Sequence, residues 1–242
     1  MIKAVPDLFV QDQELVKKGR PFIAMNTKLN VLLTRSFLVC LLLALCFGTV
    51  ALLVSRQQIA WFDETIISFV QGAESPGLTA AAGLLSEIGS SAVVPFITIA
   101  AALYLYFVLK RRSEVILLIA AIGGSAILNT ILKKIFQRER PTIHIIMEEA
   151  GFSFPSGHSM AVVGLYGILV YLLWRHISSA AGRAVLVVLA AAMIVGMGLA
   201  RIYLGVHYPS DVLGGYLASG FWLGVCIWTY RSYRNRRQSA VR

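Results

Sequence analysis

The chain has 242 residues, of which 57% are hydrophobic and 14% are charged, and its formal net charge is +10. Soluble domains contain about 45–50% apolar and about 25% charged residues, so this composition excludes an ordinary soluble domain and indicates a membrane protein. The net charge does not by itself indicate a nucleic-acid partner, because the positions of basic residues relative to apolar segments matter more than their sum.

Six stretches contain no Asp, Glu, Lys or Arg. Each is about 17 to 25 residues long, which is enough for a helix to cross a hydrocarbon core of about 30 Å. The sequence therefore predicts an all-α polytopic membrane protein with six transmembrane helices in a bundle. The stretches are Ser36–Ser55, Ile88–Leu109, Val115–Leu132, Ala150–Trp174, Ala184–Ala200 and Val212–Tyr230.

These spans divide the chain into a membrane domain, residues 31–232, and two cytoplasmic tails, residues 1–30 and the basic residues 233–242. About 35 residues precede the first apolar stretch, which is also too long for the core of a signal peptide, so we expect it to stay as an anchor. No internal repeat marks a second domain, and no obligate protein partner is indicated.

The segment after the first span has apolar residues at near-helical spacing: Ile59, Phe62, Ile66, Phe69 and Val70. This pattern predicts a short amphipathic helix in the outer membrane interface, and a linker helix packed on the bundle fits it equally well. Ser75-Pro76-Gly77 then breaks the pattern before the chain re-enters the membrane.

The basic residues predict the orientation in the membrane. Six crossings put both termini on one side, and that side carries all but six of the 22 Lys and Arg residues, so we expect cytoplasmic termini. Five of the exceptions lie in two loops on the opposite side, where an anionic substrate is the simplest reason for them. The exceptions are Arg56, Lys133, Lys134, Arg138, Arg140 and Arg201.

Some residues of the spans are predicted to serve packing. An odd number of cysteines inside apolar stretches, without a CxxC pair, indicates neither a disulfide framework nor a metal site. These cysteines are Cys40, Cys46 and Cys226. Small residues allow close approach of helices, as expected for Gly123, Gly124, Gly196 and Gly198. Glu87, at the outer edge of the second span, is a candidate for a pocket rim, and a purely structural role is its alternative.

Three polar clusters lie at the ends of apolar stretches. The first, Lys133 to Pro141, has the pattern KxxxxxxRP, and a helix continued through it would project Lys133 and Arg140 from one face to clamp one anion. The second is Pro155-Ser156-Gly157-His158, where a Pro that presets a first helical turn and small residues suit a phosphate pocket at a helix N-terminus.

The third cluster begins at Arg201 and has the pattern RxxxxxHxxxD. His207 and Asp211 are four residues apart, so on a helical turn the carboxylate holds one imidazole nitrogen and frees the other as a nucleophile. Taken singly, Arg201 or Lys133 fits an interfacial side chain as well as a ligand. His144 and His176 match no motif and are predicted to be loop residues.

In this order, on one side of six spans, the three motifs resemble those of the type 2 phosphatidic acid phosphatase superfamily. Within it, the chain is similar to bacterial membrane lipid phosphatases that act on phosphatidylglycerol phosphate or undecaprenyl pyrophosphate. The motifs lie within about 80 residues, and the six-helix plan extends the resemblance over nearly the whole chain. One position departs from the family pattern, because Ala200 stands where a Ser usually precedes the Arg of the third motif.

The resemblance implies roles for individual residues. His207 would attack phosphorus to form a phosphohistidine, Asp211 would fix its tautomer and stabilise the positive ring, and His158 would protonate the leaving oxygen and then activate water. The phosphoryl oxygens would bind a set of cationic and small residues. These are Lys133, Arg140, Ser156, Gly157 and Arg201.

The remaining charged residues of the motif region leave alternatives open. Arg138 is a candidate for a further phosphate contact or for a partner of Glu139 or Glu149. No metal or other cofactor is implied, and the acidic residues lack the spacing of a carboxylate-rich metal site.

The sequence thus predicts an integral membrane phosphatase whose active site faces outward and whose lipid substrate arrives laterally from the bilayer. Undecaprenyl pyrophosphate and phosphatidylglycerol phosphate are favoured substrates, and phosphatidic acid also fits. A transporter or flippase that binds a phosphorylated lipid without hydrolysis is the alternative from another class. A structural protein with inactive motifs is disfavoured, because the motif residues are intact.

Overall fold

The computed structural model describes residues 22–90, 92–142 and 144–240, with side chains described between Thr34 and Arg236. Within these ranges every regular element is a helix and there is no strand, which confirms the predicted all-α class. Residues 1–21, most of the predicted N-terminal tail, lie outside the described part. The helices are α2 (Phe22–Ser55), α3 (Ala60–Gln71), α4 (Pro76–Ile88), α5 (Val93–Leu103), the π-helical turn η1 (Tyr104–Val108), α6 (Arg112–Phe136), α7 (Gly157–Leu173), α8 (Ala180–Tyr203) and α9 (Pro209–Ala240).

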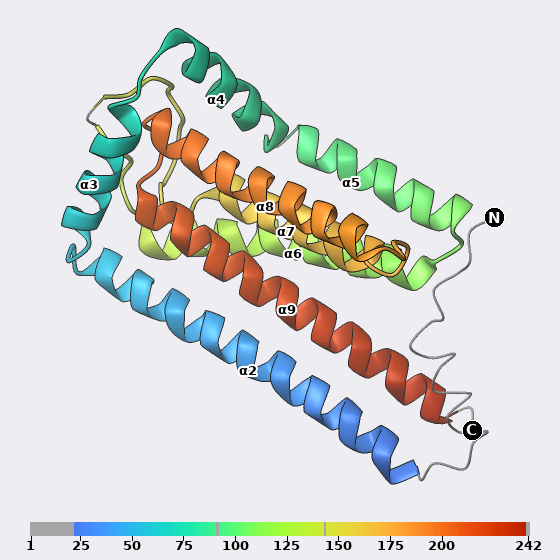
Figure 1. Cartoon of the computed structure of the whole chain (residues 1–242). Coiled ribbons are helices and arrows are strands. Elements are labelled where there is room, and N and C mark those ends of the chain that lie inside the picture. The colour runs from blue at the N-terminus through green and yellow to red at the C-terminus, as the bar shows by residue number, and fades with distance from the viewer. Residues whose placement is uncertain (1–21, 91, 143, 241–242) are drawn as a thin grey trace.

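The long helices run side by side as a bundle (Figure 1). α7 packs between α6, α8 and α9, while α2 lies along α9 and α4 lies along α8. α3 crosses one end of the bundle and contacts α8 and α9. The α6–α7 loop and the α8–α9 turn gather at this same end, which we call the α3 end (Figure 1).

Four helical segments are long and apolar enough to cross a membrane by themselves: Thr34–Ser55, Arg112–Phe136, Ala180–Tyr203 and Pro209–Arg236. The bent pair formed by α4 and α5 with η1 passes the same test of length and composition when it is taken as one broken span, which gives up to five candidate crossings among the described residues. α7 is apolar but has only 17 residues, about 26 Å at 1.5 Å per residue. The six predicted spans therefore correspond to four long helices, one broken span and one short helix.

The break in the second span differs from the straight helix that the sequence predicts from Ile88 onward. α4 begins early, at Pro76, where Ser75 accepts a hydrogen bond from the Leu78 N–H as its N-cap. The axes of the two halves then differ by 47°. Gly89 lies at the bend, and a Cβ on this residue would be 3.3 Å from His158 Cδ2 and 2.6 Å from Met197 Cε. The bend thus lets the chain pass close to the second motif.

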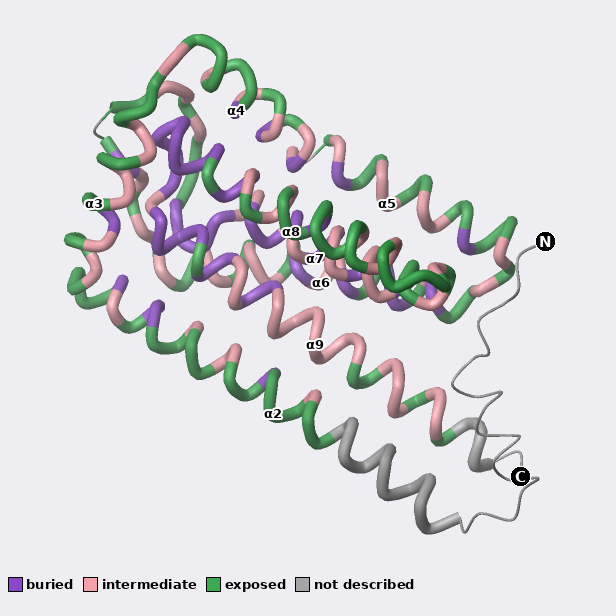
Figure 2. Tube along the Cα trace, viewed as in Figure 1, coloured by how far each residue is buried: buried purple, intermediate pink, exposed green. Residues whose placement is uncertain are grey.

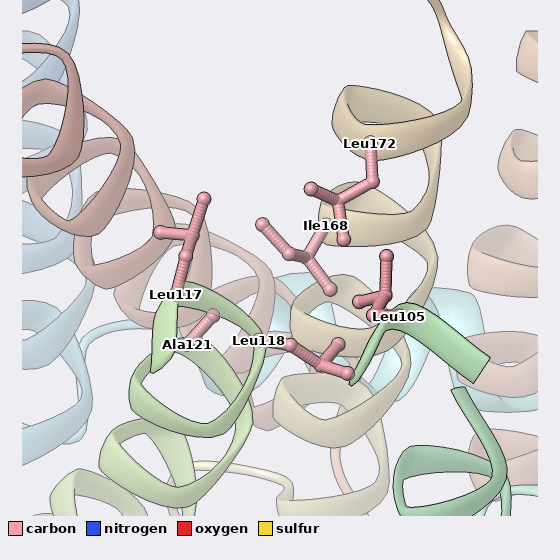
Figure 3. Packing of buried hydrophobic residues seen from close by; sticks show 6 residues of the cluster. All are labelled: Leu105, Leu117, Leu118, Ala121, Ile168 and Leu172. Atoms are coloured by element: carbon pink, nitrogen blue, oxygen red, sulfur yellow. The ribbon is translucent and has the colours of Figure 1, made fainter. Parts of the chain in front are cut away.

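Apolar side chains hold the opposite half of the bundle together. Leu105 from η1 meets Leu117, Leu118 and Ala121 from α6 and Ile168 and Leu172 from α7 (Figure 3). Outward-facing positions are equally apolar, as Leu42, Phe96, Ile116 and Val188 illustrate with well over half of each side chain exposed. A soluble protein rarely exposes apolar surface so widely, and lipid is the medium that suits it.

The buried residues concentrate toward the α3 end (Figure 2). They include polar and charged side chains that a membrane protein keeps only with partners or for a use: Asp63, Ser86, Ser153, Ser156, Arg201, His207, Ser210 and Asp211.

α3 is the short helix that the sequence predicts, and four of the five expected apolar residues are half-buried: Ile59, Phe62, Ile66 and Val70. Phe69 was assigned to the apolar face and is 83% exposed, as is Trp61 at 79%. Asp63 is instead 1% exposed and points into the bundle. Asp63 thus lies on the same face as the half-buried apolar residues, and its burial is the feature that their spacing does not predict.

Several smaller expectations are tested by the packing. A Cβ on Gly124 would lie 2.3 Å from Trp222 Cζ2, and one on Gly198 would lie 2.0 Å from Tyr216 Oη, so both glycines do permit close helix contact. Gly123 has nothing within 4 Å, and Gly196 makes only an ordinary contact with Leu85. The three cysteines are free. α2 and α9 run unbroken through the expected tail boundaries at residues 30 and 232, so the domain division stays a prediction.

Candidate active site

The three sequence clusters meet at the α3 end of the bundle, at the end of α6, the start of α7 and the turn between α8 and α9. Gly205 makes this turn possible, because its φ of +73° favours glycine and a Cβ would lie 2.4 Å from the carbonyl oxygen of His144. The α6–α7 loop is also hydrogen-bonded to the turn, since the N–H groups of Ile146 and Met147 each donate to Leu204 O at a distance of 3.1 Å. His207 is held directly after this turn.

His207 and Asp211 form a buried pair, and neither side chain is exposed. Nδ1 of His207 lies 3.5 Å from Oδ2 of Asp211. The same Oδ2 accepts hydrogen bonds from the Ser153 hydroxyl at 2.5 Å and from the Tyr208 N–H at 2.9 Å. The carboxylate is therefore fixed on the Nδ1 side of the imidazole, which leaves Nε2 as the nitrogen that can act.

The imidazole of His207 is neutral in this environment. Complete burial lowers the pKa of His207 to about 3, although its hydrogen bond with Asp211 opposes the shift. Nη1 of Arg140 lies 3.3 Å from Nε2, and a guanidinium can only donate, so Nε2 carries the lone pair and Nδ1 the proton. This is the tautomer that a nucleophilic imidazole requires.

Arg140 is held by backbone carbonyls of both the α6–α7 loop and the α8–α9 turn. Nε donates to Gly151 O at 2.9 Å, and Nη1 donates to Val206 O at 2.7 Å. Nη2 donates to Oε1 of Glu149 at 2.9 Å. The guanidinium is thereby directed at Nε2 of His207, where the oxygens of an attacked phosphoryl group would be.

Arg201 lies on the other side of the same carboxylate. Its side chain is 1% exposed, its Nη1 donates to the Ser86 hydroxyl, and its Nη2 pairs with Oε2 of Glu149. Glu149 thus bridges Arg140 and Arg201 with one oxygen on each. A carboxylate bound by two guanidinium groups marks a place that suits a phosphate group.

Lys133 and His158 complete the ring of polar groups. Lys133 is half-buried in the last turn of α6, and its charge acts on Arg140, Arg201 and Asp211. His158 is half-buried in the first turn of α7, hydrogen bonds to the backbone of Ser86, and feels the charges of Lys133 and Arg140. The three cationic side chains and the two imidazoles therefore share one polar region.

The start of α7 presents unpaired backbone N–H groups of the kind that bind anions. Ser156 is its N-cap and accepts from the Ser159 N–H at 3.4 Å, while its own N–H donates to the Asp211 carbonyl. The first N–H groups of a helix have no acceptor within it, so those of Gly157 and His158 are available to a ligand. Space there is limited, since a Cβ on Gly157 would lie 3.1 Å from Asn129 Oδ1. Ser156 is fully buried, and its hydroxyl caps the start of α7.

Comparison with known proteins decides the family. The model of the PAP2 superfamily matches residues 114–236, about half of the chain. The chain belongs to the PAP2 superfamily.

Relatives within this superfamily agree with that assignment. Phosphatidylglycerophosphatase B of Bacillus subtilis (strain 168) is 31% identical over 176 residues, which cover 72% of this chain and 86% of that protein. The protein of Escherichia coli (strain K12) named "Putative undecaprenyl-diphosphatase YbjG" is 31% identical over 131 residues, 52% of this chain and 61% of that protein. These names confirm the predicted class of enzyme, a membrane lipid phosphatase.

A solved structure matches the fold. It is described as the crystal structure of the first transmembrane PAP2 type phosphatidylglycerolphosphate phosphatase from Bacillus subtilis, and it superposes with a TM-score of 0.71 at 26% identity. The match covers 82% of this chain and 96% of that one. The helices before residue 114, which lie outside the family model, are thus largely part of the shared fold.

One expectation about the first PAP2 motif is wrong. α6 ends at Phe136, and Gln137 adopts a left-handed conformation with φ 45°. Lys133 and Arg140 therefore do not share a helical face, and Arg140 reaches the site from an extended loop. The same turn directs Arg138 toward Asp211 rather than toward Glu139 or Glu149, with Nη1 donating to Oδ1 at 2.6 Å. The carboxylates of Asp211 and Asp63 raise the pKa of Arg138 although burial opposes them.

Sequence reasoning also missed several residues of the PAP2 site. Ser153 lies just before the second motif, and its hydroxyl is the closest donor to Asp211. Ser86 and Asp63 come from helices outside the three motifs. A polar residue inside an apolar pattern was the available signal for both. Ser210 directly precedes Asp211, and that proximity was its signal. Glu149 was considered only as a partner of Arg138, whereas it pairs with Arg140 and Arg201.

Glu87 and Ala200, whose roles the sequence leaves undecided, both have defined surroundings in the structure. Glu87 is exposed, yet its charge acts on His158, so it lies at the edge of the site. Ala200 packs in an apolar cluster with Ala82, Tyr203 and Leu204, and a Ser hydroxyl there would face apolar neighbours. Among the described residues, no group of three His, Cys, Asp or Glu side chains is arranged to hold a metal ion.

Proposed function

We propose that this protein hydrolyses the phosphate or pyrophosphate group of a membrane lipid through a phosphohistidine on His207. The observation that carries the proposal is the approach of Arg140 Nη1 to within 3.3 Å of His207 Nε2, beside the anion position defined by Arg201 and Glu149. A phosphate that replaces the Glu149 carboxylate would have its oxygens on the two guanidinium groups and its phosphorus near Nε2.

In the first step, Nε2 of His207 forms a bond to phosphorus while the bond from phosphorus to the lipid oxygen breaks. His158 supplies a proton to that oxygen. Asp211 stabilises the positive charge that develops on the phosphorylated ring, because its carboxylate faces the protonated Nδ1.

In the second step, a water oxygen attacks phosphorus, the bond from Nε2 to phosphorus breaks, and His158 takes up the water proton. Arg140, Arg201 and Lys133 stabilise the phosphoryl charge in both steps, with the N–H groups at the start of α7 assisting. Each preorganised donor of this kind contributes about 3 kcal/mol to transition-state stabilisation.

The lipid substrate is proposed from the surface and from the relatives. The helices expose apolar side chains to the bilayer, so a lipid would reach the polar region laterally between helices. The names of the relatives support phosphatidylglycerol phosphate and undecaprenyl pyrophosphate. We propose that the site faces outward, because the positive-inside rule assigns the opposite end of the bundle to the cytoplasm.

The proposal is tested with purified protein and a panel of lipid phosphates. We expect phosphate release that persists in EDTA, a trapped phosphoenzyme, and loss of both in His207→Ala protein that remains folded. Complete dependence on an added metal would contradict the mechanism. Recovery of intact lipid after binding, with no phosphoenzyme, would instead support a transporter or flippase.

A further inference from the structure

We infer that Asp63, on α3, is a positioning residue for the proposed reaction: it holds Arg138 where Arg138 fixes the Asp211 carboxylate against His207. This inference rests on the proposed hydrolysis at His207. It assigns a function to a helix that contains none of the three motifs and lies outside residues 114–236.

The first observation is that the only fully buried residue of α3 carries a carboxylate. Asp63 is 1% exposed, whereas its neighbours Trp61 and Glu64 are exposed. A buried ionised carboxylate is costly unless charged or hydrogen-bonding partners compensate for lost water. An apolar residue at this position of α3 would be buried without the cost of removing a carboxylate from water.

The second observation is that both carboxylate oxygens of Asp63 bind groups next to Asp211. Oδ1 accepts from the Ser210 N–H at 2.8 Å, and Oδ2 accepts from the Ser210 hydroxyl at 2.7 Å. Ser210 directly precedes Asp211 in the first turn of α9. Asp63 therefore fixes the start of α9, where a negative charge is also favoured by the helix dipole.

The third observation is the bridge made by Arg138. Nη2 pairs with Oδ2 of Asp63 at 2.7 Å, while Nη1 pairs with Oδ1 of Asp211 at 2.6 Å and donates to the Ser210 hydroxyl. The Tyr208 ring covers the guanidinium, with Cζ 3.9 Å from the ring centroid. One planar guanidinium thus joins two buried carboxylates in a fixed geometry.

The bridge has a direct consequence for the nucleophile. Because Arg138 takes Oδ1 of Asp211, the other oxygen, Oδ2, is turned to Nδ1 of His207. Asp63 also shares the positive charge of Arg138. Without that sharing, Arg138 would neutralise Asp211 more completely, and Asp211 would stabilise a positive phosphohistidine less.

The test compares Asp63→Asn with Glu64→Gln, which makes the same chemical change at the adjacent, exposed position of α3. With enzyme in excess over labelled lipid, the rate constant of the first turnover does not depend on a small misfolded fraction. We expect Asp63→Asn to lower this rate constant and kcat about 10- to 100-fold, the usual cost of losing a group that orients a reacting side chain, with KM nearly unchanged. Glu64→Gln should stay within about twofold of wild type.

A second variant keeps the test decisive if Asp63→Asn protein does not fold. Arg138→Lys retains the charge but cannot join two carboxylates, so its first-turnover rate constant should fall similarly at unchanged KM. An unchanged rate constant in either folded variant overturns the inference while leaving the proposed function standing, including when only the melting temperature falls. Absence of phosphate release from the wild-type protein overturns both.

Discussion

His207 combines a reactive role with complete burial, and this combination has a measurable effect on stability. Its folded-state pKa lies below the ordinary value of about 6.5 because burial disfavours the charged ring. Between the two pKa values the unfolded chain binds a proton that the folded chain does not. Stability is therefore present above about pH 6.5 and is lost as the pH falls toward about 3.

We predict that wild-type protein loses more stability than His207→Asn between pH 7 and pH 5. The difference should be on the order of 2 kcal/mol, because only the wild type must keep an imidazole neutral in the folded state. Thermal unfolding in detergent micelles at the two pH values measures it. Equal losses in the two proteins would show that folding does not lower the pKa of the His207 ring.

Glu149 is the second residue whose chemistry can be tested singly. Its carboxylate occupies Arg140 and Arg201, the two groups proposed to bind phosphate, so an incoming anion must displace it. Glu149→Gln should therefore bind inorganic phosphate or orthovanadate about tenfold more tightly, a difference of about 1.4 kcal/mol. Inhibition constants measure this.

Glu148→Gln is the matched control for Glu149→Gln, since Glu148 is exposed in the same loop. Its inhibition constants should equal those of the wild type. Unchanged or weaker anion binding by Glu149→Gln would mean that this carboxylate does not compete with phosphate.

At the scale of elements, α6 and α9 pack closely because Gly124 has no side chain where the two helices meet. Gly124 faces the Trp222 indole, whose Nε1 donates to Ala120 O at 3.0 Å, so the ring is fixed where a Cβ would have to lie. Gly123, one residue earlier, has nothing within 4 Å. The two adjacent glycines are thus in opposite situations on one helix.

We predict that Gly124→Ala destabilises the protein by about 1–3 kcal/mol, because overpacking pushes α9 away from α6. Gly123→Ala should be neutral or stabilising by about 0.5–1 kcal/mol, since alanine favours the helix and meets no neighbour. Melting temperatures of both variants give the comparison. The opposite order would show that Trp222 adapts and that α6 and α9 are not in tight contact there.

At the scale of the whole molecule, the distribution of basic residues and the position of the site give one orientation in the membrane. We predict that a Cys at Gln58, near α3, reacts with an impermeant maleimide in intact cells. A Cys at Ser178, in the α7–α8 connection, should react only after permeabilisation. Both are exposed positions. Labelling in the reverse pattern would place the active site on the cytoplasmic side.

The control for this labelling is a background without native thiols. Cys40, Cys46 and Cys226 are free and need replacement first. Retained phosphate release in that background would show that the labelled proteins are folded.

The sequence was most informative where chemistry is local in the chain. The apolar stretches predict the spans, and the motif residues His207, Asp211, Arg140 and Arg201 are brought together by the structure. The left-handed Gln137 was not predictable, because no Gly or Pro marks the end of α6. The buried Asp63 was not predictable either, because its burial depends on Arg138, 75 residues later.

The contacts of α3 and α4 bear on how this enzyme family can be divided. Ser86 binds Arg201, Gln71 binds the carbonyls of His144 and Tyr203 at 3.1 Å, and Asp63 binds the start of α9. All three donors or acceptors precede residue 114, where the family model begins. A shortened phosphatase made only of residues 114–236 would keep the motifs and lose the side chains of α3 and α4 that position them. A chimera of two relatives should therefore take α3 and α4 from the same parent as the motif helices, so that these contacts are preserved.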